Sequence, residues 1–245
     1  MGAAPAVAAV IQARSSSSRL PGKVSRSLDT MSVLGWVIRA AARADGIDRI
    51  IVATSDQPDD DAVAEDAREH GADVVRGPLD DVLARFLLAT ERYPADAVLR
   101  LTADCPLLDP ALLSQVVALW RQQPTLDYVS TDVVRTLPRG LDAELVRTDV
   151  LAEQARHPHG PHREHVTWGV KHDPARYACQ GIVVVPRADD LRVTLDTEQD
   201  WALITGVVTA LGDGPHPWRD VVALLRARPD LVALNADVEQ KEVRP

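Results

Sequence analysis

The sequence predicts an α/β protein with a doubly wound, mostly parallel sheet in a Rossmann-like three-layer arrangement, together with a small additional lobe. Short aliphatic runs alternate with segments of helical spacing through about the first half of the chain. Aromatic residues make up only 4% and hydrophobic residues 46%, so aliphatic side chains must fill most of the core, as when helices pack on a buried sheet. Polar loops follow the clearest strands, and ligands bind at such positions in these sheets.

The first half of the chain supplies the alternating elements. The strands are expected at 7–11, 49–53, 74–75 and 97–101, and the helices at 33–43, 59–70, 79–92 and 110–120. Gly46 and Gly71 end the first two helices, and Pro110 suits the first position of the fourth. Because parallel strands end at the same edge of a sheet, the loops 12–23, 54–56 and 102–104 should meet at one crevice.

Beyond residue 126 the alternation becomes irregular. Strands are expected at 127–130, 178–185 and 191–195, and closing helices at 199–211 and 218–226. We expect a single domain over 1–245, with an inserted lobe at about 130–175 that covers the site or joins two subunits. The charged tail from Asn235 should be frayed.

Composition limits the classes of function. The net charge of −9 argues against nucleic-acid binding and against an anionic membrane, because phosphate groups are normally bound by a basic surface. Two cysteines do not make a disulfide framework. No apolar run approaches the roughly 20 residues that span a bilayer, and the N-terminus lacks the pattern of a signal peptide. We therefore expect a soluble, cytoplasmic protein.

The loop from Gln12 to Lys23 is the segment richest in chemical groups. It directly follows the first strand and holds four serines with three cations, Arg14, Arg19 and Lys23. Exposed amides and cations on a flexible loop suit a triphosphate. The chain has only three lysines, so Lys23 stands out as a compact charge for a phosphate group. Composition alone also allows a solvated, serine-rich loop.

Two aspartates follow buried segments and are candidate metal ligands. Asp104 comes after the strand at 97–101, and Asp196 comes after the one expected at 191–195. Two separated carboxylates, completed by water and phosphate oxygens, make an oxygen-rich site for Mg²⁺. Each aspartate also has a structural interpretation, Asp104 in a turn and Asp196 at a helix N-cap, which leaves Asp200 as a substitute ligand.

The histidines at 157, 159, 162 and 165 crowd nine positions and raise the question of zinc. They are not accompanied by a cysteine pair or a His-Glu-x-x-His motif, and His157-Pro158-His159-Gly160-Pro161 suggests a loop. The sequence therefore does not favour a zinc site in this tract.

Seven segments in order carry a family resemblance. They are Ile11-Gln12-Ala13-Arg14 through Lys23, 51–55, Arg76-Gly77-Pro78-Leu79-Asp80-Asp81 through Phe86, 100–107, Gly140-Leu141-Asp142-Ala143-Glu144, 163–167 and 195–200. Together they resemble the CMP-sugar synthetases, which include the CMP-KDO and CMP-sialic acid synthetases, and in particular the branch named for spore coat polysaccharide biosynthesis protein F. One such segment is weak evidence, but seven with compatible spacing over about 7–201 are strong.

The resemblance implies a nucleotide-diphospho-sugar transferase-like fold and a nucleotidyltransferase, specifically a cytidylyltransferase. It would transfer CMP from CTP to a small acidic acceptor (a sugar acid, phosphonate or sugar phosphate) and release pyrophosphate. The implied catalytic residues are Lys23, Arg14, Asp104 and Asp196, with Mg²⁺ held by the two aspartates. A homodimer is implied as well, since relatives commonly pair through the lobe that matches 130–175.

The resemblance also assigns binding residues. Those implied for the nucleotide are Gln12, Ala13, Arg14, Arg19, Lys23, Ala53, Thr54, Ser55, Arg76, Gly77, Asp81 and Thr102. Those implied for the acceptor are Arg100, Glu144, Arg163, His165 and Lys171. Asp80 and Asp81 could instead be acidic residues of a helix's first turn, and Arg85 could be a surface residue of that helix. The likeness is poorer at 131–137 and 157–162, which leaves the acceptor's identity open.

Other functions remain possible on the same fold. A glycosyltransferase would need an Asp-x-Asp metal motif at a strand end, whereas Asp59–Asp61 and Asp80-Asp81 stand at helix starts. A nucleotidylyltransferase using UTP, ATP or GTP is a second alternative. A non-catalytic nucleotide-binding or scaffold protein is a third, although the presence of Lys23, Asp104 and Asp196 argues against it.

Overall fold

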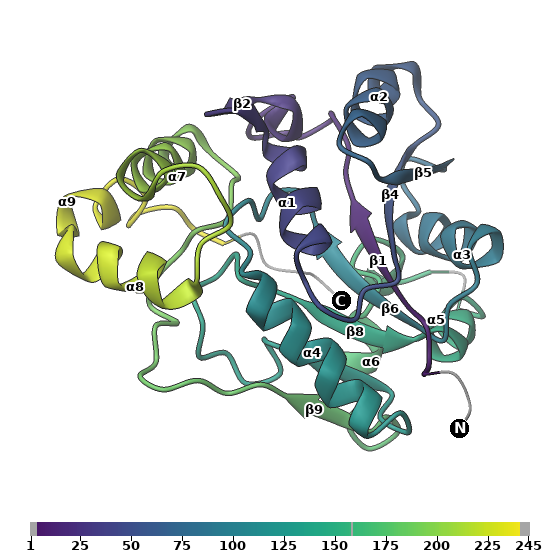
Figure 1. The fold of residues 1–245 in the computed structure, drawn as a ribbon. Coiled ribbons are helices and arrows are strands. Elements are labelled where there is room, and N and C mark those ends of the chain that lie inside the picture. The colour runs from purple at the N-terminus through teal and green to yellow at the C-terminus, as the bar shows by residue number, and fades with distance from the viewer. Residues whose placement is uncertain (1–3, 158, 241–245) are drawn as a thin grey trace.

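A central β-sheet organises the molecule in the computed structural model, which describes residues 4–157 and 159–240 (Figure 1). Its strand order is β5-β4-β1-β6-β8-β7-β9. The bounds are β1 Val7–Gln12, β4 Arg49–Ser55, β5 Asp73–Gly77, β6 Ala97–Thr102, β7 Tyr128–Ser130, β8 Glu144–Arg147 and β9 Cys179–Gly181. Strands β5, β4, β1 and β6 are parallel, whereas β8 runs antiparallel to both β6 and β7. The predicted doubly wound, mostly parallel sheet is therefore confirmed.

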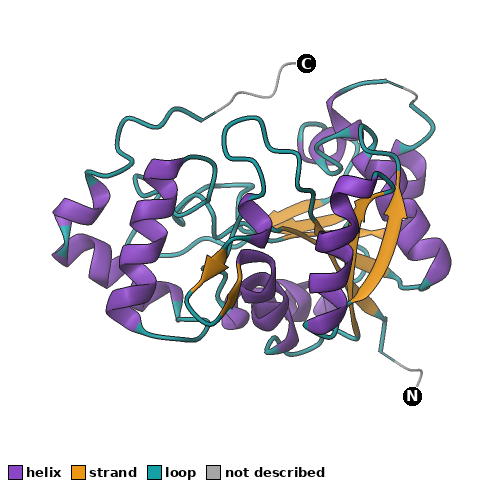
Figure 2. Cartoon of the chain, turned by 90° about the horizontal axis from the view of Figure 1, so that it is seen from above, coloured by secondary structure: helices purple, strands orange, loops and turns teal. Residues whose placement is uncertain are grey.

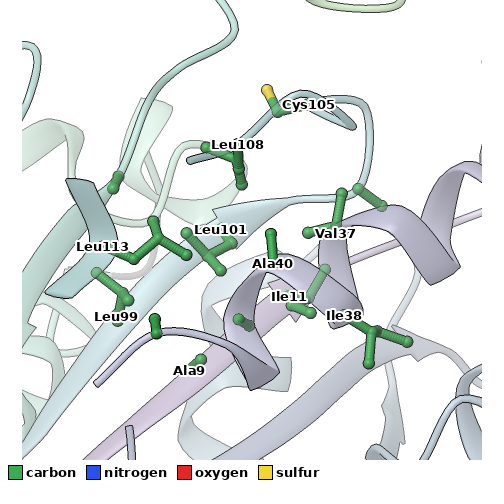
Figure 3. Close-up of a cluster of buried hydrophobic side chains, with 14 of the residues drawn as sticks. Ala9, Ile11, Val37, Ile38, Ala40, Leu99, Leu101, Cys105, Leu108 and Leu113 are labelled. Atoms are coloured by element: carbon green, nitrogen blue, oxygen red, sulfur yellow. The ribbon is translucent and has the colours of Figure 1, made fainter. Parts of the chain in front are cut away.

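Helices cover both faces of this sheet, which makes the three layers. On one face lie α1 (Val33–Ala42), α2 (Asp61–Glu69) and α4 (Pro110–Gln122), and on the other lie α3 (Val82–Arg92), α5 (Thr148–Gln154) and α6 (Trp168–Lys171). Ala9 and Ile11 of β1 face Val37 of α1 (Figure 3), while Ala8 and Val10 pack against the opposite layer. This alternation follows from the two-residue period of a strand.

A third apolar cluster lies beside the sheet. It is built by α7 (Glu198–Leu211), α8 (Trp218–Ala227) and α9 (Pro229–Val232), which stand together at one end of the molecule (Figures 1 and 2). The hairpin of β2 (Ser27–Leu28) and β3 (Met31–Ser32) and the buried Trp36 of α1 join this cluster. Single turns η1 (Lys23–Ser25), η2 (Pro58–Asp60) and η3 (Pro161–Arg163) lie within the loops.

Strand prediction in the second half is partly wrong. The strand expected at 178–185 is a strand only over 179–181, and the one expected at 191–195 does not form. The latter segment is extended and makes one isolated bridge, between Arg192 and Arg139. Leu191, Val193 and Leu195 are buried in the third cluster, so their alternation reflects packing against helices instead of membership of a sheet.

The range 130–175 contributes to the central sheet as well as to loops. It contains β8, which lies between β6 and β7, together with α5, η3 and α6. Its proposed part in dimerisation stays a prediction.

The tail also differs from expectation at its start. Asn235 is 5% exposed and its Nδ2 donates to Asp200 Oδ1 at 2.8 Å, so fraying does not begin there, and residues 241–245 lie outside the described part. Within that part, none of the helices combines the length and the apolar character that crossing a membrane demands.

Candidate functional site

A cavity of about 1250 Å³ opens where β1 and β6 end. Two of the three loops that should meet there do so, namely 12–23 and 102–104. The sequence-predicted residues that line it are Gln12, Ala13, Arg14, Arg19, Lys23, Arg100, Thr102, Asp104, His165 and Asp196. The cavity is therefore built largely from residues of the family-like segments.

Lys23 lines this cavity and connects two of its aspartates. The Nζ atom lies 2.8 Å from Asp104 Oδ2 and 2.9 Å from Asp196 Oδ1, and it donates to the Leu195 carbonyl at 2.7 Å. Burial lowers the pKa of Lys23, but the two carboxylates outweigh it and raise the pKa above its usual value. Burial likewise raises the pKa of Asp104, and the Lys23 ammonium overcomes this and holds it below the usual range. Both groups are charged at neutral pH.

Asp196 is bound by two further cations. Arg19 Nη2 lies 3.1 Å from Oδ2 of Asp196, and Arg192 Nη2 lies 2.7 Å from the same oxygen. The Asp196 carboxylate is thus paired with three cations, Lys23, Arg19 and Arg192. Asp104 also pairs with Lys23, and Asp200 also pairs with Arg192, so three carboxylates balance these three cations.

Asp200 is held entirely within the protein. It is fully buried and forms a capping box with Thr197 at the start of α7. Its carboxylate also accepts from Arg192 Nε at 2.9 Å and from Asn235 Nδ2 at 2.8 Å. Burial raises the pKa of Asp200, but the Arg192 and Asn235 hydrogen bonds hold it below the usual range. Since these donors use both oxygens, Asp200 is unsuited to be a substitute metal ligand.

Asp104 and Asp196 fit a divalent cation. Both carboxylates and the Leu195 carbonyl converge on the Lys23 ammonium, which occupies the point where they meet. Mg²⁺ is commonly held by one or two carboxylates, with substrate phosphates and water as the other ligands. In 4–157 and 159–240 there is no group of three or more His, Cys, Asp or Glu side chains that could hold a metal. His162 of the histidine tract contacts the His157 carbonyl at 2.9 Å through Nε2.

The end of β4 supports the serine-rich loop from behind. Ala13 N donates to the Ala53 carbonyl at 3.3 Å. The buried Asp60 accepts from Ser15 N at 2.7 Å and from Ser55 N at 3.1 Å, and so it joins the loop to β4. Ala53, Thr54 and Ser55 are fully buried and do not line the cavity. These three residues contribute to the cavity indirectly, because the end of β4 holds the backbone of the serine-rich loop in place.

Arg85 lines the cavity near Arg14, which corrects the alternative that made it a surface residue. Its side chain is 1% exposed, and Nη1 donates to the carbonyls of Pro78 and Leu79 at 3.2 Å each. Burial, and then the neighbouring Arg14 charge, lower the pKa of Arg85. Arg14 itself lies 3.5 Å from a carboxylate oxygen of Glu164.

Three further residues predicted for the nucleotide also lie apart from the cavity wall. Arg76 donates to the Ser55 carbonyl at 2.8 Å and does not line the cavity. Gly77 is buried, and a side chain there would collide with Leu88. Asp81 caps α3 by accepting from Ala84 N at 2.9 Å, and it is paired with Arg163. Asp81 is therefore the N-cap of α3, whereas the alternative had placed it in the first turn of the helix.

A second cavity, of about 490 Å³, adjoins the first. The two share Arg100, Arg139, His165 and Gln240. Four of the five residues predicted for the acceptor line the second cavity, namely Arg100, Glu144, His165 and Lys171. It is also lined by Asp132, Arg135, Thr167, Trp168 and His172, and the last two have stacked rings with centroids 4.4 Å apart.

Ion pairs order the wall of the second cavity. Glu144 is paired with Arg100 and accepts from Tyr128 Oη at 2.7 Å and from Thr167 Oγ1 at 2.9 Å. Burial, and then the Glu144 charge, raise the pKa of Tyr128 well above its usual value, so the phenol stays a donor. Lys171 is paired with Asp132 in the same wall.

Sequence reasoning missed Arg135 and Arg139, which line the cavities, and Arg192, which binds Asp196 but lines neither cavity. Arg135 and Arg139 lie in the polar stretch 131–142, and Arg192 lies in the segment mistaken for a strand. For Arg135 and Arg139, a signal was available: two arginines lie just before the Gly140-Leu141-Asp142-Ala143-Glu144 motif. That stretch was interpreted only as a polar loop.

The chain is similar to several known proteins. The family model described as Cytidylyltransferase matches residues 8–164. Spore coat polysaccharide biosynthesis protein SpsF of Bacillus subtilis (strain 168) is 31% identical over 230 residues, which cover 90% of this chain and 94% of that protein. The 8-amino-3,8-dideoxy-manno-octulosonate cytidylyltransferase of Shewanella amazonensis is 34% identical over 137 residues, 51% of this chain and 54% of that enzyme. The structure of a cytidylyltransferase from Leptospira borgpetersenii serovar Hardjo-bovis superposes with a TM-score of 0.88 at 25% identity, covering 96% and 98% of the two chains.

Proposed function

Because this chain belongs to the cytidylyltransferase family, we propose that it transfers CMP from CTP to a small acidic acceptor and releases pyrophosphate. The observation that carries the proposal is the ammonium of Lys23 between Asp104 and Asp196 at the bottom of a cavity of about 1250 Å³. This arrangement offers both the cations that a triphosphate needs and the carboxylates that a divalent metal needs.

The reaction is a displacement at the α-phosphorus of CTP. An acceptor oxygen forms a bond to that phosphorus, the bond to the bridging oxygen of the β-phosphate breaks, and pyrophosphate leaves with the electron pair. A hydroxyl acceptor must also lose its proton, and the base would be either water on the metal or the Asp196 carboxylate. An acceptor that arrives ionised needs no base.

The residues of this chain supply position and charge. Arg14, Arg19 and Lys23 bind the triphosphate, and their charges stabilise the negative charge that develops on the leaving group. Mg²⁺ bound by Asp104 and Asp196 would neutralise phosphate oxygens in the same place. We propose that the second cavity holds the acceptor, because it adjoins the first at Arg100 and His165.

The first test is pyrophosphate release from CTP, UTP, ATP and GTP with Mg²⁺, against a panel of sugar acids, phosphonates and sugar phosphates. Release only with CTP and one class of acceptor would support the proposal. Calorimetry with CTP and Mg²⁺ on the same sample separates the alternatives. Binding of CTP without turnover with any acceptor would favour the non-catalytic alternative, and absence of binding would overturn the proposal.

Asp104→Asn tests the role of the central cluster. The amide keeps the shape of the side chain but loses the charge that faces Lys23, so kcat should fall at least about 100-fold with the fold intact. The matched control is Asp213→Asn, which changes an exposed aspartate that is paired with Arg39. A near-normal rate for Asp104→Asn, with normal pyrophosphate release by the control, would contradict the assignment.

A further inference from the structure

Arg192 binds two carboxylates beside the site without reaching either cavity. Its Nη2 donates to Asp196 Oδ2 at 2.7 Å, and its Nε donates to Asp200 Oδ1 at 2.9 Å. The side chain is 11% exposed, and Arg192 belongs to the wall of neither cavity. Any effect that Arg192 has on the reaction therefore has to pass through the residues that it binds.

Asp196 is fixed at both its backbone and its carboxylate. Its N–H donates to Asp200 Oδ2 at 2.9 Å, and its Oδ2 accepts from Arg192 Nη2. The other oxygen, Oδ1, accepts from Lys23 Nζ at 2.9 Å, and the same ammonium donates to Asp104 Oδ2 at 2.8 Å. Arg192 thus occupies one oxygen of Asp196 and leaves the other directed to the point that Asp196 shares with Asp104.

The backbone around Arg192 is held against residue 139. Arg139 N donates to the Leu191 carbonyl at 3.0 Å, and Val193 N donates to the Arg139 carbonyl at 2.7 Å. Gly140 has φ +104°, and a Cβ there would lie 2.6 Å from the carbonyl carbon of Val193. Only glycine allows this close approach, so the side chain of Arg192 starts from a well-defined backbone position.

The C-terminal segment 235–240 holds Arg192 from a third direction. Asn235 is 5% exposed, and its Nδ2 donates to the Arg192 carbonyl at 3.3 Å and to Asp200 Oδ1 at 2.8 Å. Gln240 Oε1 accepts from Arg192 Nη1 at 2.7 Å. All three guanidinium nitrogens of Arg192 therefore have an acceptor, and because the group is planar and rigid these contacts determine its orientation.

We propose that Arg192 is a positioning residue for Asp196: it occupies Oδ2, so that Oδ1 is the oxygen offered to Mg²⁺, and the segment 235–240 keeps Arg192 in this orientation. The inference rests on the proposed transfer of CMP with Mg²⁺. It goes beyond that proposal because it gives a role to an arginine that lines neither cavity and to the C-terminal segment. Groups that orient metal ligands commonly change metal affinity about 10–100-fold when they are replaced.

Arg192→Lys separates position from charge, because lysine keeps the positive charge but lacks the planar fork that binds both carboxylates. Calorimetry measures the Kd of CTP with and without Mg²⁺, in the absence of any acceptor. The Kd with Mg²⁺ should rise about 10-fold in the variant, whereas the Kd without Mg²⁺ should change less than about 2-fold. The matched control is Arg26→Lys, which weakens an ion pair with the exposed Glu198 outside both cavities and should change neither Kd.

Gln240→Ala is a second variant, which serves also if Arg192→Lys does not fold. Gln240 is exposed, so its replacement should leave the fold intact, and it removes the acceptor of Arg192 Nη1. The Kd of CTP with Mg²⁺ should rise about 3-fold, as expected for the loss of one hydrogen bond. Without Mg²⁺ the Kd should be unchanged, whereas loss of a direct contact with CTP would raise it in both conditions.

Failure of this inference can be told from failure of the proposed function. Wild-type protein that does not bind CTP would defeat the proposed function and the inference together. If wild-type protein binds CTP, an unchanged Kd with Mg²⁺ in folded Arg192→Lys would overturn the inference alone. So would a wild-type affinity for CTP that does not respond to Mg²⁺, or a loss in the variant that is equal with and without Mg²⁺. Thermal unfolding shows which variants are folded.

Discussion

Lys23 lies between two carboxylates that come from distant parts of the chain, and this contact explains much of the candidate site. Asp104 follows β6 and Asp196 precedes α7, so their loops meet only because the fold brings both beside the loop after β1. The ammonium offsets the repulsion that these two aspartates would otherwise exert on each other. The site is therefore assembled before any ligand arrives.

Lys23→Met should leave the repulsion between Asp104 and Asp196 without compensation. The variant keeps a long side chain but removes the ammonium, so the metal-free protein should lose about 2 kcal/mol in unfolding free energy. Added Mg²⁺ should raise the unfolding temperature of the variant more than that of the wild type, because the metal is stabilising only where it binds the native state. Thermal unfolding with and without Mg²⁺ measures both effects, and equal Mg²⁺ shifts in the two proteins would contradict the prediction.

Asp60 supplies a pH-dependent link between the serine-rich loop and β4. Burial raises the pKa of Asp60, but hydrogen bonds from Ser55 and Ser15 hold it below its usual range. A carboxyl with a lowered pKa in the folded state stabilises the protein above its unfolded pKa of about 3.9, and this contribution is lost as the pH falls through the lower folded value.

Asp60→Asn should therefore cost about 1–3 kcal/mol in unfolding free energy at pH 7, because the amide nitrogen then faces backbone N–H donors. The difference between variant and wild type should be constant above about pH 5 and should shrink below about pH 4. Urea unfolding of both proteins at several pH values is the measurement. A difference that is the same at pH 3 and pH 7 would show that the charge of Asp60 is unimportant.

At the scale of elements, the sequence predicts the strands and helices that have a clear pattern of apolar residues of their own. The buried strands β1, β4 and β6 and the helices between them follow from runs of aliphatic residues and from helical spacing. Strand β8 was missed because Glu144–Arg147 has only two apolar residues and depends on β6 and β7 to pair with it on both sides. Residues 191–195 are the opposite case. Their alternating apolar residues predicted a strand, but these residues are buried against helices and form no strand.

The first turn of α7 offers a prediction at this scale. Asp200 holds Thr197, Arg192 and Asn235 together, so Asp200→Ala removes one of the two carboxylates that bind Arg192 and should cost about 3 kcal/mol in unfolding free energy. Glu198 in the same turn is exposed and is paired only with Arg26. Glu198→Ala, the control, should leave the urea midpoint almost unchanged. Similar losses in the two variants would mean that Asp200 acts only through the helix end.

At the scale of the whole molecule, the sequence predicted where the site lies better than it predicted which residues line the site. Lys23, Asp104 and Asp196 were identified because they follow buried segments, and the topology brings the ends of those segments together. Position along a strand does not determine where a side chain points, so Arg76 and Thr54 were expected in the cavity but lie outside its wall. Arg139 was missed because irregular loops lack a repeating pattern, and Arg192 was missed because its segment was mistaken for a strand.

The exposed edge of the sheet bears on the expected homodimer. Strand β9 is the last strand, and just after it Val183 and Val185 are 59% and 80% exposed. We expect a second copy of the chain to cover these valines, and analytical ultracentrifugation should give twice the chain mass of 26.6 kDa.

Replacing both valines with lysine should reduce the measured mass toward that of one chain. Leu88→Lys is the control, because Leu88 adjoins Gly77 of β5 at the opposite edge of the sheet. A wild-type protein that sediments as a single chain would contradict the expectation of a dimer. A dimer that survives both substitutions would place the interface elsewhere.

The two cavities share four residues of their walls, so they form one continuous trough. A molecule long enough to occupy both at once would gain from the high effective concentration of its second half once the first is bound. The conjugate formed by joining the two substrates is such a molecule. It should bind more tightly than either substrate alone, and its departure should limit the rate of turnover. Accumulated product should then inhibit the enzyme, and a stable mimic that spans the trough is a rational starting point for an inhibitor.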